Sequence, residues 1–299
     1  MAVGAGAAGA AVARRRLSAA APGERRRRIV NAAATGLIAA AAALSSLVLV
    51  LILGYVAWQG LPALNLPFFT ERPRPYGEVG GGVAPAILGT LIMLLVAALL
   101  SVPLGIGTAI YLAEFGRGAF ARLVRLVVDL LAGLPSIVVG VFVWALLVRH
   151  VVGQYSGLAG AVALAIIMVP IMTRSVEEIL RLVPDALRES ALALGVPRWR
   201  TILGVVLPTA RVGVITGVAL SLARAGGETA PLLLTALGNQ FFSFNLLGPM
   251  AALPVQIYTY AVSPYDDWHT KAWGSALILV LVVGCLSLAA RAVTGRARW

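Results

Sequence analysis

Six long apolar runs constrain this chain more than any other feature. They occupy residues 30–58, 86–113, 123–149, 157–173, 205–236 and 272–294. An α-helix needs about 20 apolar residues to cross the hydrocarbon of a bilayer, where its backbone hydrogen bonds must be satisfied within the segment. The runs therefore predict an all-α integral membrane protein with six transmembrane helices, although the fourth run is short and contains Pro170.

The composition supports this class and argues against a nucleic-acid-binding protein. Hydrophobic residues make up 60% of the chain, charged residues make up 12%, and the mean hydropathy is +0.93. Soluble domains carry roughly 25% charged residues. The net charge of +12 could suggest a nucleic-acid partner, but most of the arginines lie in an N-terminal cluster and in short loops between apolar runs. That distribution is typical of membrane topology signals.

The arginines also predict the orientation. Segments 1–29, 114–122, 174–204 and 295–299 are rich in arginine, whereas 59–85, 150–156 and 237–271 hold only Arg72, Arg74 and Lys271. By the positive-inside rule both termini are cytoplasmic. We thus expect a basic, disordered cytoplasmic segment over 1–28 and a six-helix domain over 29–299. This domain has a cytoplasmic loop at 174–204 and large outer loops at 59–85 and 237–271.

The loop 174–204 is more strongly patterned than a simple connection requires. Arg174 with Glu178, and Glu177 with Arg181, have the i,i+4 spacing of ion pairs on a helix. Further along the loop, this spacing gives way to a short amphipathic segment.

A short helix is expected inside this loop. Leu187, Ala191 and Leu194 form one apolar stripe, Gly195 can end the helix in a left-handed turn, and Pro197 prevents its continuation. Such a helix either docks into a groove of a partner or lies on lipid headgroups. The pattern alone does not separate the two.

The third apolar run contains a charge and a predicted break. Asp129 can pair with Arg125 or with an arginine of a nearby loop. Gly133 and Pro135 predict a kink or an unwound turn. Such backbone at membrane depth faces protein or a water-filled path, so the hydroxyl of Ser136 could contact a passing anion; a simple packing kink is the alternative.

The fifth run, "SLARAGGETAPLL", contains Arg224 and Glu228. A charge near the bilayer centre costs at least about 2.5–3.5 kcal/mol and usually faces a bundle interior or an aqueous path. On one continuous helix the two residues would lie one turn apart on the same face. They are either a structural ion pair or part of a path in which arginine offsets the desolvation of an anion.

The chain shows no pattern for catalysis, metal binding or ATP hydrolysis. It has no G-x-x-x-x-G-K-[ST] and no H-E-x-x-H, its two histidines stand apart from other ligand types, and its only lysine is Lys271, in a predicted outer loop. We therefore expect no enzyme activity, no cofactor and no metal site in this chain.

The stretch "ESALALGVPRWRTILGVVLP" resembles the EAA loop of bacterial ABC importer permeases. The matching positions are Glu189, Ala191, Gly195, Leu207 and Pro208, with a serine where the motif has its first alanine, and the adjacent Arg188 belongs to the same segment. The resemblance implies a type I importer fold in the bacterial cytoplasmic membrane. It also implies that this loop docks on a separate ATPase subunit, which uses ATP and Mg.

The stretch "ARAGGETAPLL" is similar to phosphate importer permeases, and "FFTERPRPYGEVGGGVAPAILGTL" is similar to their PstA type. The resemblance implies that Arg224 and Glu228 serve phosphate translocation; Thr229 of the same motif and Ser136 complete the expected path. Expected partners are a PstC-type permease, two ATPase copies, a phosphate-binding protein, inorganic phosphate and membrane lipid. A permease for sulfate or molybdate, and a membrane scaffold or sensor that docks an ATPase, remain alternatives.

Overall fold

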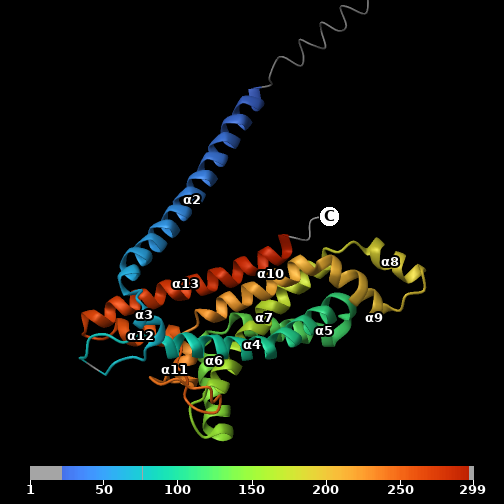
Figure 1. The fold of residues 1–299 in the computed structure, drawn as a ribbon. Coiled ribbons are helices and arrows are strands. Elements are labelled where there is room, and N and C mark those ends of the chain that lie inside the picture. Colours follow the sequence, from blue (N-terminus) through green and yellow to red (C-terminus); the bar gives the residue numbers. More distant parts are fainter. Residues whose placement is uncertain (1–21, 76, 296–299) are drawn as a thin grey trace, which may run out of the picture. The chain divides into compact units, whose positions relative to one another are not determined.

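The computed structural model describes residues 22–75 and 77–295, and every regular element in this part is a helix or a helical turn. By contacts the chain divides into residues 1–55 and 56–299. The predicted all-α class is confirmed. The elements (Figure 1) are α2 (Pro22–Gly60), η1 (Leu61–Ala63), α3 (Leu66–Thr70), α4 (Ala84–Ile110), η2 (Tyr111–Phe115), α5 (Gly118–Gly133), α6 (Ser136–Val143), η3 (Trp144–Val152), α7 (Gly157–Arg181), α8 (Asp185–Ala193), α9 (Arg198–Thr201), η4 (Ile202–Val206), α10 (Leu207–Gly226), α11 (Ala230–Thr235), α12 (Leu253–Ala261) and α13 (Asp266–Gly295).

The first span begins earlier than the sequence predicts. Helix α2 starts at Pro22, so the expected disorder of 1–28 is wrong for residues 22–28; residues 1–21 lie outside the described part. Proline is suited to a first helical position, and the arginines that follow are good helix formers. The basic cluster Arg25–Arg28 therefore lies within the helix instead of preceding it.

The described chain contains five helices long and apolar enough to cross a membrane, or six if one bent pair counts as a single span. They follow the six predicted runs in order. The bent pair is α5 with α6 and η3, whose axes differ by 103°. The break lies at the predicted place: α5 ends at Gly133, and Pro135, which lacks a backbone N–H, directly precedes α6.

The fifth run differs from its prediction. We expect one helix over 205–236, but α10 ends at Gly226 and α11 begins at Ala230. Adjacent glycines at 226 and 227 weaken the helix, and Pro231, the second residue of α11, has no N–H for a continuing helical bond. Residues 227–229 therefore form a break.

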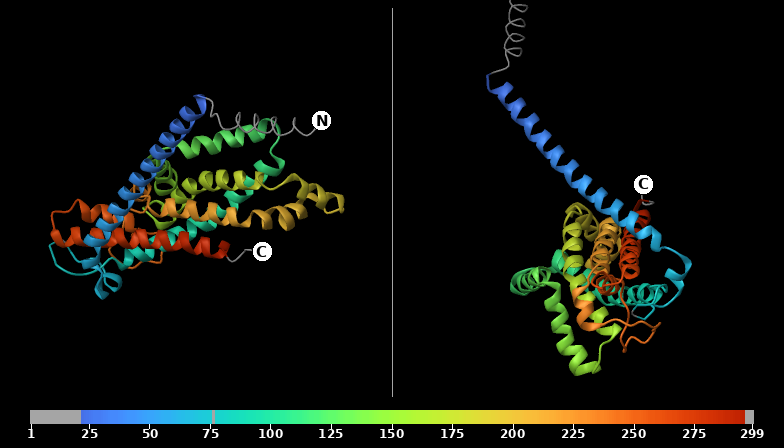
Figure 2. Two further views of the ribbon diagram at one scale, coloured as in Figure 1. Left: turned by 90° about the horizontal axis from the view of Figure 1, so that it is seen from above. Right: turned by 90° about the vertical axis from the view of Figure 1, so that its left-hand side faces the viewer.

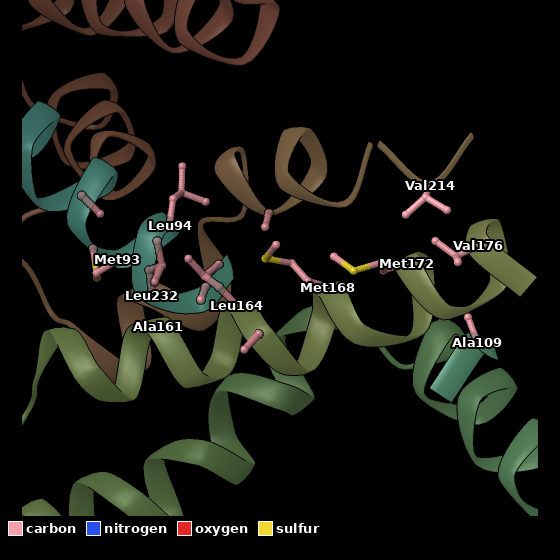
Figure 3. Close-up of a cluster of buried hydrophobic side chains, with 14 of the residues drawn as sticks. Met93, Leu94, Ala109, Ala161, Leu164, Met168, Met172, Val176, Val214 and Leu232 are labelled. Carbon is pink, nitrogen blue, oxygen red and sulfur yellow. The ribbon is translucent and has the colours of Figure 1, made fainter. Parts of the chain in front are cut away.

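Helix α7 is at the centre of the main core (Figure 3). Met93 and Leu94 of α4, Met168 and Met172 of α7, and Leu232 of α11 are all buried there. The helices approach closely because small residues face the methionines: a Cβ on Gly160 would lie 2.9 Å from the sulfur of Met93. Helix α10 packs beside α7, with α13 along its other side (Figure 2).

The segment 236–252 closes one end of this bundle. The amides of Gly157 and Leu158 donate to the carbonyl oxygens of Gly248 (3.0 Å) and Leu246 (2.7 Å), which joins the segment to the start of α7. Met250 is 1% exposed, and the Leu253 amide donates to the Thr90 hydroxyl oxygen of α4 at 2.8 Å. Residues 246, 248 and 250–252 of the expected outer loop 237–271 therefore contact the helix ends.

We expect Gly89→Ala to destabilise the protein. A Cβ there would lie 2.1 Å from the carbonyl oxygen of Ala251, and overpacking of this kind costs about 1–3 kcal/mol. Thermal unfolding of the purified protein in detergent measures the effect. Gly107→Ala in the same helix is the control, because nothing lies within 4 Å of its Cβ. Equal stability of the two variants would contradict this close contact.

Candidate functional site

The two charges of the fifth run meet at the break between α10 and α11. Arg224 lies in the last turn of α10, and Glu228 lies in the break. Their closest atoms, Nη2 and Oε1, are 3.8 Å apart, too far for a hydrogen bond. The side chain of Arg224 is 63% exposed and that of Glu228 is 13% exposed. Arg224 therefore presents a charge whose donors are largely available to a further ligand.

Thr229 directly precedes α11, and α11 packs against α6. The contact is close because a Cβ on Gly140 of α6 would lie 2.7 Å from Cα of Pro231. Helix α6 begins with the half-buried Ser136. The break before α6 and the break before α11 are therefore each followed by a helix, and these two helices touch. No hydrogen bond between described residues joins Ser136 to Arg224 or Glu228.

Helix α7 continues to Arg181, so the first part of the expected cytoplasmic loop 174–204 is helical, as the i,i+4 spacing of its charges predicts. Glu177, whose side chain is 3% exposed, lies between three arginines. Its carboxylate is 3.1 Å from Arg125, 3.5 Å from Arg174 and 2.6 Å from Arg181. A buried carboxylate needs such partners, since an unpaired buried charge is strongly destabilising. The predicted Glu177–Arg181 pair is confirmed.

Arg174 does not pair with Glu178 as its spacing predicts. Its Nε donates to Oδ1 of Asp129 at 2.8 Å, across from α7 to α5. Asp129 therefore pairs with Arg174, an arginine of the expected loop 174–204, which is one of its two predicted partners. Arg125, the other predicted partner, pairs with Glu177 instead. A residue of a neighbouring helix, Asp129, therefore replaces the i,i+4 partner Glu178.

Helix α8 is the short helix expected inside the loop. Ala191 is buried at 8% exposed, but Leu187 is 40% and Leu194 is 83% exposed, so the predicted stripe does not face one surface of the chain. Glu189 is exposed. Gly195 has φ +79°, which confirms the predicted left-handed turn. Leu207 and Pro208, which complete the motif, are the first two residues of α10.

Arg188 has a partner that sequence reasoning missed. Its Nη2 and Nε are 2.7 and 3.1 Å from Oε1 of Glu114, which lies in η2 and is 9% exposed. Hydrogen bonding to Glu114 raises the pKa of the Arg188 guanidinium above its ordinary value. The only signal in the sequence is an acidic residue directly after an apolar run, 74 positions before Arg188. Nothing in that spacing predicts contact.

Comparisons of the sequence with known proteins identify the family of this chain. Residues 101–298 match the model of the family "Binding-protein-dependent transport system inner membrane component". The phosphate transport system permease protein PstA of Pasteurella multocida is 46% identical over 80% of this chain and 85% of its own length. That of Yersinia pestis is 44% identical over 82% and 83%, and that of Mycobacterium leprae is 45% identical over 71% and 70%.

Solved structures support the fold. An inward-facing structure of the MetNI methionine ABC transporter aligns with a TM-score of 0.61 and 22% identity, over 72% of this chain and 95% of that one. A bacterial ABC transporter that imports the acidic polysaccharide alginate aligns with a TM-score of 0.57 and 16% identity, over 91% and 100%. The chain therefore belongs to the binding-protein-dependent transport system inner membrane components, in the group represented by the PstA phosphate transport system permeases.

Proposed function

We propose that this multi-pass inner membrane protein is the permease subunit of an ATP-driven importer of inorganic phosphate. The observation that carries the proposal is 46% identity to a phosphate transport permease over 80% of the chain. The chain supplies part of the translocation path and no catalytic site. ATP hydrolysis belongs to a separate subunit.

The partners follow from what one chain can contribute. It has a single docking segment, α8, and an importer driven by two ATPase copies needs two. A second permease of the PstC type therefore completes the path. The ATPase copies bind ATP and Mg and contact α8 on the cytoplasmic side, where both termini of this chain also lie. A phosphate-binding protein delivers the ion to the opposite face.

Arg224 is the residue that we assign to the phosphate. Its guanidinium is exposed and, among the residues that the structure describes, is held only by a 3.8 Å ion pair, so its planar set of donors can bind an oxyanion through two hydrogen bonds. A fixed positive charge offsets the desolvation of an anion within about 30 Å of hydrocarbon. Glu228 partners the arginine when the path is empty and keeps it from holding phosphate too tightly. Thr229 and Ser136 offer hydroxyl groups next to the two chain breaks.

We expect Arg224→Ala to lower ATP-driven uptake of labelled phosphate by about tenfold or more, the loss expected when hydrogen bonds to a charged group are removed. The measurement uses vesicles that hold the complete complex, with ATPase activity followed in parallel and with sulfate and molybdate as competitors. Arg211→Gln, which removes a charge from the same helix, is the control. Unchanged uptake by Arg224→Ala would refute the assignment of Arg224 to the path. Preferential inhibition by sulfate or molybdate would indicate that this anion, and not phosphate, is the substrate.

We also expect Gly195→Ala to weaken ATPase binding. Alanine in the left-handed region costs about 1–2 kcal/mol, which corresponds to about 5- to 30-fold in an equilibrium. Nothing lies within 4 Å of its Cβ, so the effect comes from the backbone. The affinity of the purified ATPase subunit for the permease pair is the measurement. Gly204→Ala, at normal φ and also without close neighbours, is the control, and equal affinities would refute the turn's importance.

A further inference from the structure

Three arginines from three different helices hold the single helical turn η2. Arg125 of α5 donates to the carbonyl oxygen of Leu112 at 2.9 Å. Arg188 of α8 binds the carboxylate of Glu114. Arg198 of α9 donates to the carbonyl oxygen of Glu114 at 2.8 Å. The turn is therefore a junction between the end of the α4 span and both helices of the loop that follows α7.

The contact from α8 is the most buried ion pair of this junction. The side chains of Arg188 and Glu114 are 17% and 6% exposed, and two guanidinium nitrogens face the same carboxylate. Since such a buried pair leaves an uncompensated charge when it opens, α8 and η2 are held to move together.

Arg188 also fixes α8 to α7. Its Nη2 donates to the carbonyl oxygen of Leu180 at 2.8 Å, and its Nη1 donates to that of Val183 at 2.5 Å. Helix α7 is joined to α8 by a short stretch of chain, but α4 has no such covalent route. Glu114 thus provides a non-covalent route from α8 to the α4 span.

The turn η2 has the wide π-helical form, which is uncommon and often marks functional positions. Contacts to η2 are not limited to the carboxylate of Glu114. The guanidinium of Arg198 also lies over the ring of Phe115, 4.9 Å from its centroid. A segment held this way is positioned by its neighbours.

The α4 span connects this junction with the charged break of the candidate path. It runs continuously from Ala84 to Phe115. A Cβ on Gly226, the last residue of α10, would lie 3.6 Å from Cδ1 of Leu94 in α4. Towards its other end, the hydroxyl oxygen of Thr90 accepts a hydrogen bond from the amide of Leu253, the first residue of α12. A displacement of η2 along this helix would therefore reach both places.

We propose that Glu114 is a positioning residue that transmits displacement of α8 to the α4 span, and through α4 to the Arg224–Glu228 break. The inference rests on the proposed function, in which α8 contacts the ATPase. Glu114 does not touch phosphate. It acts through Arg188, because the ion pair makes the docking helix α8 and the α4 span move together.

The test measures the ratio of phosphate taken up to ATP hydrolysed, in vesicles that hold the complete complex. We expect Glu114→Gln to assemble and hydrolyse ATP, while the ratio falls about fivefold or more, the lower end of ordinary coupling between sites. Asp129→Asn is the matched control: it removes an exposed ion pair between α5 and α7 that touches neither α8 nor α9, and such pairs contribute little. Its ratio stays at the wild-type value.

In a complex that assembles, a purely structural role would lower uptake and ATP hydrolysis together and leave their ratio unchanged; that result would overturn the proposal, as would fully wild-type behaviour of Glu114→Gln. If Glu114→Gln does not assemble, Arg188→Lys, which keeps the charge but loses the planar fork, is measured in the same way. A wild-type ratio in that variant overturns the proposal, and a lowered ratio with intact ATPase activity supports it. Wild-type phosphate uptake in the same vesicles tests the proposed function separately.

A mechanical rescue distinguishes transmission from a local charge effect. In a Cys285→Ser background, Glu114→Cys and Arg188→Cys are joined by a short cleavable cross-linker. We expect the linked protein to regain the ratio that the unlinked double variant lacks, and to lose it again when the linker is cleaved. A linked protein that stays uncoupled would contradict the transmission route.

Discussion

The requirement that a backbone in lipid satisfy its own hydrogen bonds governs the rest of this structure. It makes every described regular element helical and turns each interruption of a helix into a position that other parts of the protein must cover. The interruptions after Gly133 and after Gly226 are each followed by a short helix, and these two helices, α6 and α11, pack closely against each other. Gly140 of α6 lies against Pro231 of α11, where no larger residue would fit.

Charge burial is the second constraint, and it is met differently at the two ends of the bundle. At the α8 end, Glu114 and Glu177 are buried and each is held by arginine at hydrogen-bond distance. At the break after α10, the Arg224–Glu228 pair is loose and its arginine is exposed. Tight pairs suit a junction that must keep its shape, and a loose pair suits a site that exchanges partners with an anion.

These two ends are joined by helices of the central core. Helix α7 is the most buried span, and methionines on α4 and α7 fill the space that small residues leave open. The same packing that stabilises the bundle brings α4 close to Gly226, and α4 continues directly into η2. The function that we propose requires the ATPase contact and the substrate path to be connected, and one continuous helix, α4 with η2, runs between the two places that we assign to them.

Local patterns in the sequence determined the apolar spans, the break at Gly133 and Pro135, the left-handed turn at Gly195 and the charged pair of the fifth run. Each depends on residues close together in the chain, so propensity and periodicity suffice. Only the tertiary structure decided that Arg174 pairs with Asp129 and that Arg188 pairs with Glu114. Those outcomes depend on which helices are neighbours, because a charged side chain pairs with the partner that packing brings within reach, however distant that partner is in sequence.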